Sequence, residues 1–269
     1  MRSPFPKVRQ MGFTLIELLV ALGIFLLVAG AAFTLLGSSQ RRYQTESQVL
    51  TSFQEARLGL DQIVRDVNDA GYPPPSFFQA GFPNLSTKSP FAWSPGYAGP
   101  PCQIGTGGGG SCDAPGDFDL IVETDPNPQD PSCAPGCQVQ WIRYQLQGTT
   151  LMRGAVFKGG NNPGSSTTGS LAPFVQNVVN NSSPAQITQF QTFYPSMFPA
   201  GIPVPIFSYT CDSGGATLDC PTAGSGNSPV NIRDVMVTLI VAAPLTDATT
   251  GQPRLVQLTG RGRRVNPNQ

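Results

Sequence analysis

The chain has 269 residues, of which 39% are hydrophobic and 12% charged, with 30 Gly and 27 Pro. Sixteen basic residues balance sixteen acidic ones, so the net charge gives no general attraction to nucleic acid or anionic lipid. Without histidine, the chain excludes Ser-His-Asp and Cys-His catalysis and histidine-bound metals. We therefore expect no enzyme, no cofactor and no metal site.

The first feature along the chain is a 24-residue apolar run from Phe13 to Leu36, in which Glu17 is the single charged residue. About 20 such residues cross a bilayer as a helix. A carboxylate in a span costs about 2.5–3.5 kcal/mol at the bilayer centre, so it usually has a partner or a function. A secretory signal peptide has a shorter apolar core. A plain membrane anchor explains the length of the run, but it leaves Glu17 unexplained.

The segment Gly12-Phe13-Thr14-Leu15-Ile16-Glu17 resembles the processing site of the type IV pilin superfamily, after the basic residues Arg2, Lys7 and Arg9. In that family a prepilin peptidase cuts after the glycine and methylates the new N-terminal residue. The resemblance implies a leader at 1–12, cleavage between Gly12 and Phe13, and N-methylation of Phe13. It also implies that Glu17 pairs with the N-terminal amine of a neighbouring subunit. The mature chain would carry a formal side-chain charge of −3.

Helical periodicity continues beyond the apolar run and predicts one helix over 13–70, about 87 Å long. Its 13–36 part is the expected transmembrane or filament-core helix, and 37–71 is an amphipathic half that packs on a soluble domain. The expected apolar stripe is Val49, Leu50, Phe53, Leu60, Ile63, Val64 and Val67. Asp66 is assigned to the solvated face. Gly71 and Pro73 end the helix.

Residues 72–269 form the expected extracytoplasmic, β-rich globular domain. It opens with an irregular insertion at 72–117. A hairpin is predicted from 138–147 and 151–157, and a flexible connector at 159–170. The other expected strands are 118–123, 187–194, 204–209, 232–243 and 254–265. A long helix followed by an antiparallel meander predicts an α+β fold.

Six cysteines lie in this domain, where an extracytoplasmic location would allow disulfides to persist. They are Cys102, Cys112, Cys133, Cys137, Cys211 and Cys220. Six cysteines allow 15 pairings, and sequence alone cannot choose among them. Their clustering suggests three short local loops, 102–112, 133–137 and 211–220. A zinc site is the rival interpretation, but histidine and paired CxxC spacing are both lacking.

Two further groups of residues are candidate ligand sites. Asp113, Asp117, Asp119 and Asp125 could meet around calcium, but their spacing does not match an EF-hand and favours turns. Arg261, Arg263 and Arg264 could contact DNA phosphates. Without an aromatic platform, a solvated or subunit-facing strand is favoured, and no nucleic acid partner is expected.

The order of elements also resembles that of PilW-like minor pilins and of J-type pseudopilins of type II secretion. Those groups have a strand pair carrying Tyr-x-Leu and Leu-x-Arg, here 144–146 and 151–153, and an Arg-rich final strand, here 261–266. The resemblance implies a minor pilin, a structural subunit in type IV pilus assembly or initiation. The alternatives are a J-type pseudopilin and, from another class, a membrane-anchored binding module or adhesin.

The same resemblance implies partners and a location. The expected partners are other pilin or pseudopilin subunits, the prepilin peptidase and inner-membrane lipid. The chain would cross the inner membrane once, with the leader cytoplasmic and the domain periplasmic, since basic residues stay on the cytoplasmic side. It would then enter a pilus or pseudopilus.

Overall fold

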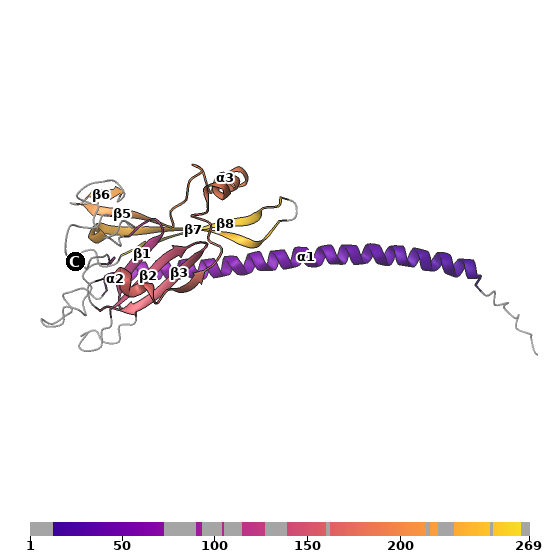
Figure 1. The fold of residues 1–269 in the computed structure, drawn as a ribbon, viewed down its shortest axis with the longest axis horizontal. Coiled ribbons are helices and arrows are strands. Elements are labelled where there is room, and N and C mark those ends of the chain that lie inside the picture. Colours follow the sequence, from indigo (N-terminus) through magenta and orange to yellow (C-terminus); the bar gives the residue numbers. More distant parts are fainter. Residues whose placement is uncertain are drawn as a thin grey trace, which may run out of the picture. The chain divides into compact units, whose positions relative to one another are not determined.

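The computed structural model describes residues 13–72, 90–92, 104, 115–126, 139–159, 162–213, 216–219, 229–247 and 250–264. Within these ranges a long N-terminal helix is followed by antiparallel β-sheets (Figure 1). The predicted α+β class is therefore confirmed. The predicted leader and most of the 72–117 insertion lie outside the described residues.

Helix α1 runs from Leu15 to Asn68 without interruption, so the single predicted helix is confirmed to within two residues at each end. The chain divides into two compact units, Met1–Ser47 and Gln48–Gln269. In the first unit the apolar side chains of α1 are exposed, with Leu27 at 76% and Phe33 at 73%. An 18-residue window of α1 has a mean hydropathy of 2.6, so the helix is long and apolar enough to cross a membrane.

In the second unit, one stripe of α1 enters the core. Its buried apolar members are Val49, Ala56, Leu60, Ile63, Val67. Two expectations for this stretch are wrong. Leu50 is 60% exposed, because it lies about 100° around the helix from the buried Val49. Asp66 is 3% exposed instead of solvated, because polar side chains of a sheet meet it there.

The first sheet has the strand order β1-β2-β3-β4, with antiparallel pairing throughout. Its strands are β1 (Asp119–Thr124), β2 (Gln140–Gln147), β3 (Thr150–Phe157) and β4 (Ala172–Val175). The predicted strand at 118–123 and the predicted hairpin are confirmed. Gly148 takes a φ of +59° in the two-residue turn between β2 and β3, a conformation that glycine adopts at little cost. The short strand β4 was not predicted.

The second sheet has the order β6-β5-β7-β8 and is also antiparallel. Its strands are β5 (Phe207–Ser213), β6 (Ala216–Asp219), β7 (Ile232–Thr246) and β8 (Pro253–Arg263). A 3-10 turn, Pro229–Asn231, leads into β7. The predicted strands at 232–243 and 254–265 are confirmed, whereas the strand expected at 204–209 begins three residues later. The strands form two sheets instead of one continuous meander.

Two short helices correct the sequence interpretation. Helix α2 (Pro163–Thr168) lies in the stretch predicted as a flexible connector. Helix α3 (Pro184–Phe193) replaces the strand predicted at 187–194. Its start is local: Pro184 occupies the first turn, and the Ser183 backbone N–H donates to Gln186 Oε1 at 3.3 Å. Ile187 and Phe190, three residues apart, are then buried on one helical face.

Helix α1 packs against both sheets, and three glycines make the close approach possible. A Cβ on Gly59 would lie 2.4 Å from Val175 Cγ2 of β4. On β8, a Cβ on Gly260 would lie 2.9 Å from Val64 Cγ2, and one on Gly262 would lie 2.5 Å from Val67 Cγ1. These separations are shorter than van der Waals contact, so only glycine fits without a shift of the neighbouring side chain, helix or strand.

Candidate processing and assembly site

The N-terminal end of α1 is a closed hydrogen-bonded pair made by Thr14 and Glu17. The Thr14 backbone N–H and its Oγ1 hydroxyl both donate to Glu17 Oε2, each at 2.9 Å. The Glu17 backbone N–H lies 3.3 Å from Thr14 Oγ1, to which it donates. Thr14 directly precedes the first helical residue, Leu15, so the pair is a capping box. The Thr-x-x-Glu spacing thus specifies where the helix begins.

This arrangement leaves part of the carboxylate available. Both hydrogen bonds to the carboxylate of Glu17 involve Oε2, and no hydrogen bond to Oε1 is formed by the described residues. The neighbouring side chain of Phe13 is 88% exposed. In the single chain the carboxylate therefore has one oxygen held by the capping box and one open to a further donor. Gly12 lies outside the described residues, so cleavage between Gly12 and Phe13 stays a prediction.

A second polar cluster joins α1 to the first sheet. Asp66 Oδ2 accepts from the Tyr144 hydroxyl at 2.5 Å and from Arg153 Nη2 at 3.0 Å. Arg153 Nε also donates to the Tyr144 oxygen at 3.0 Å, and Gln62 Nε2 donates to Asp66 Oδ1 at 2.7 Å. Burial, and then the negative charge of Asp66, raise the pKa of Tyr144. The tyrosine and arginine of the two strand motifs therefore meet on one helix carboxylate, which the sequence interpretation missed.

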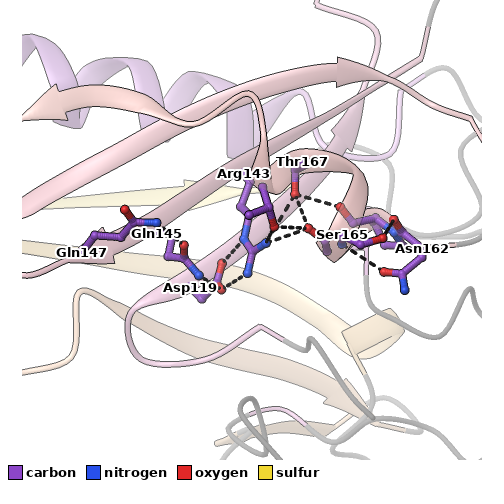
Figure 2. A network of polar contacts seen from close by, with 10 residues as sticks. Asp119, Arg143, Gln145, Gln147, Asn162, Ser165 and Thr167 are labelled. Carbon is purple, nitrogen blue, oxygen red and sulfur yellow. Dashed lines mark hydrogen bonds and ion pairs between the residues drawn. The ribbon is translucent and has the colours of Figure 1, made fainter. Parts of the chain in front are cut away.

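A third cluster attaches α2 to the outer side of the first sheet (Figure 2). The Arg143 side chain donates from Nε to Asp119 Oδ1 at 2.9 Å and from Nη1 to the Gly164 carbonyl at 2.8 Å. Gln145 Nε2 donates to Asp119 Oδ2 at 2.9 Å. Asn162 caps α2 through a 3.1 Å bond from the Ser165 N–H. Asp119 is thus occupied by an ion pair and an amide.

The described ranges hold no group of three or more acidic, cysteine or histidine side chains placed to bind a metal. Asp113 lies outside these ranges. The predicted basic strand is partly neutralised, because Arg261 Nη2 lies 2.7 Å from Asp234 Oδ2. Cys211, on β5, is buried and disulfide-bonded. The other five cysteines lie outside the described residues, so the predicted pairings stay predictions.

Two comparisons with known proteins give a match, one over the N-terminal segment and one over most of the chain. Residues 8–33 match the family model of the prokaryotic N-terminal methylation motif. A type IV-like pilin from Thermus thermophilus is similar in structure at 11% sequence identity and a TM-score of 0.38, with 80% of this chain and 97% of that chain covered. No curated protein gives a significant match. The predicted prepilin-type motif is confirmed by the family model.

The chain therefore carries a prokaryotic N-terminal methylation motif over residues 8–33. Its long apolar helix is consistent with membrane anchoring.

Proposed function

We propose that the chain is a minor pilin, a structural subunit that takes part in assembly or initiation of a type IV pilus. Cleavage between Gly12 and Phe13, followed by methylation, creates an N-methylated α-amine on Phe13. The observation that carries the proposal is Glu17: a carboxylate in an otherwise uncharged apolar segment, with one oxygen open to a donor. The large domain after residue 71 favours a minor pilin over a J-type pseudopilin.

The proposed mechanism is pairing of two charges in an apolar environment. A carboxylate or an amine alone in lipid suffers a large loss of solvation, which a close opposite charge offsets. The Phe13 amine of one subunit therefore pairs with the Glu17 carboxylate of another. Thr14 keeps Oε2 oriented while Oε1 accepts from the incoming amine. Exposed apolar side chains such as Leu27 and Phe33 then leave lipid for contact with neighbouring helices.

The test removes the carboxylate without changing the span. In a strain carrying Glu17→Ala or Glu17→Gln, we expect normal membrane insertion but loss of the subunit from the filament fraction. Glu46→Ala is the matched control, because Glu46 is an exposed acid on the same helix outside the apolar run. Normal incorporation of the Glu17→Ala protein into filaments would refute the proposed pairing.

A membrane-anchored binding module that never enters a filament is separated by the mature N-terminus. Mass spectrometry of the membrane-extracted protein is expected to show a chain beginning with N-methyl-Phe13. A chain that retains Gly12 and the preceding residues would contradict processing and favour the anchor. Co-purification with pili, as opposed to a secretion complex, then separates the minor pilin from the pseudopilin.

A further inference from the structure

The four outermost strands of the two sheets differ in how their free edges are protected. The edge of β1 is paired, with a bridge between Phe91 and Val122 and a 2.9 Å bond from the Ala92 N–H to the Ile121 carbonyl. Strand β4 has four residues, includes Pro173 and follows a register shift. Strand β6 also has only four residues. Short strands, proline and irregular register are three of the usual protections against unwanted pairing, beside charged side chains.

Strand β8 carries exposed arginines but is neither short, nor interrupted by an internal proline, nor irregular in register. It pairs with β7 over nine consecutive residue pairs, from Asp234–Arg263 to Ala242–Leu255, without a register shift. Its proline, Pro253, stands at the first position, outside this stretch. Among the residues that the structure describes, no strand pairs with the other side of β8. The result is a long, regular and open strand edge.

The backbone direction along this edge follows from two contacts. The Thr238 N–H of β7 donates to the Ile206 carbonyl at 2.8 Å and so points away from β8, where Thr259 is its register partner. At the end of β8, the Arg263 N–H donates outward to Asn68 Oδ1 at 2.8 Å. In an antiparallel strand the N–H and C=O of one residue point to the same side, and successive residues alternate. In β8 the even-numbered residues therefore face β7, and the odd-numbered residues face outward. Within the described part of the chain, Gln257, Thr259 and Arg261 therefore present backbone groups without a partner to the open edge.

The side chains beside this edge indicate the chemistry of a partner strand. On one face lie the exposed residues Gln257, Thr259, Arg261 and Arg263, which include two cations and no acid. Arg263 forms no ion pair within the described residues, whereas Arg261 shares Asp234. On the other face lies Gly260, where a Cβ would lie 2.9 Å from Cγ2 of the half-buried Val64 of α1. An added strand would thus place carboxylates on the first face and apolar side chains on the second.

We propose that the edge of β8 from Leu255 to Arg261 binds an extended segment of a partner polypeptide as an added strand, in which acidic and apolar side chains alternate. The backbone of the segment pairs with the outward groups of Gln257, Thr259 and Arg261, which gives affinity. A carboxylate near Arg263 and an apolar side chain against Val64 give selectivity. The site is separate from the Glu17 segment, so it does not depend on the proposed assembly contact.

The test uses the full chain in detergent micelles and a labelled nine-residue peptide that alternates aspartate and valine. We expect fluorescence anisotropy to show saturable binding. The Thr259→Pro variant removes one outward N–H without removing a bond to β7, and it should weaken binding at least tenfold. Thr259→Val is the matched control, which keeps the N–H and should bind like the wild type. Arg263→Glu should lower the affinity for this peptide and raise it for a lysine–valine peptide.

Hydrogen exchange gives a measurement that does not depend on the folding of any variant. The aspartate–valine peptide should slow amide exchange at Gln257, Thr259 and Arg261 of the wild-type chain, with little change at Val256, which already faces β7. No slowing at these amides, equal binding by Thr259→Pro, or equal binding of the lysine–valine peptide would each overturn the proposal. Peptide-independent dimerisation that Thr259→Pro abolishes would replace it with a second copy of this chain as the occupant.

Discussion

The hydroxyl of Tyr144, on β2, donates a hydrogen bond to the buried carboxylate of Asp66, on α1, across 78 positions of sequence. The Arg153 guanidinium completes the group with an ion pair to the same carboxylate oxygen, 3.0 Å away. The cluster fixes the axial position of the helix on the sheet, because the three side chains come from α1, β2 and β3 and fit in one register. Like the Thr14–Glu17 pair near the start of α1, the cluster is a hydrogen-bonded group built around one carboxylate of the helix.

Replacing Asp66 with alanine is expected to destabilise the domain by about 2–3 kcal/mol. Removing one partner of a buried pair usually costs about 3–5 kcal/mol, but the Arg153 side chain keeps 28% of its surface exposed, so solvent offsets part of the loss. Tyr144→Phe should cost less, about 1–2 kcal/mol, since the Asp66–Arg153 ion pair remains while the hydroxyl that donates to Asp66 and accepts from Arg153 Nε is lost. Urea unfolding followed by tryptophan fluorescence measures both. Asp61→Ala, an exposed acid on the same helix, is the control, and a loss as large as that of Asp66→Ala would contradict a specific role for the cluster.

Gly262→Ala is expected to cost about 1–3 kcal/mol, because the new methyl group would lie 2.5 Å from Val67 Cγ1 and force the helix and strand apart. Gly169→Ala is the matched control. A Cβ at Gly169 meets nothing within 4 Å, and its φ of −74° suits alanine. Thermal unfolding of the two variants should therefore separate clearly. Equal melting temperatures would show that β8 does not need the close approach.

We expect the free energy of unfolding to fall above pH 10, because two tyrosines are buried in the folded domain. Burial raises the pKa of Tyr209, followed by the charges of Asp119 and Asp117, and burial with the Asp66 charge raises that of Tyr144. Above pH 10 the unfolded chain releases these phenolic protons while the folded chain retains them, so the free energy of unfolding falls as pH rises. Urea midpoints at pH 9 and 11 should show this fall, and it should be smaller in Tyr209→Phe. Tyrosinate absorbance of both residues at pH 11 without unfolding would contradict the expected burial.

Loss of the Thr14 hydroxyl is expected to loosen the first turn of α1. Thr14→Val removes the Oγ1 contacts to Glu17, and a lost N-cap costs about 1 kcal/mol. Amide hydrogen exchange in the first turn should then accelerate by about fivefold in the detergent-solubilised chain. Thr14→Ser keeps the hydroxyl and should exchange like the wild type. If valine and serine variants exchange alike, the capping box does not order this turn.

The N-terminal motif and helix could be predicted because their signals are local: an apolar run, one carboxylate and a Thr-x-x-Glu spacing. Asp66 could not be placed in the core in this way, because its partners Tyr144 and Arg153 lie 78 and 87 positions away. The division of the strands into two sheets could not be predicted for the same reason, because it depends on contacts between distant segments. Helix α3 is different, since Ser183, Pro184 and Gln186 are a local signal for the start of a helix. The strand prediction followed instead from the high β-propensity of Ile187 and Phe190.

The glycine contacts of α1 have a mechanical consequence. Val175 of β4 approaches the helix at Gly59, and β8 approaches it at Val64 and Val67 through Gly260 and Gly262. A pulling force along the helix axis loads these contacts in shear, together with the Asp66 ion pair. Contacts loaded in shear must break together, whereas contacts peeled from one end break in turn. The domain should therefore resist extraction of its own helix as a single mechanical unit.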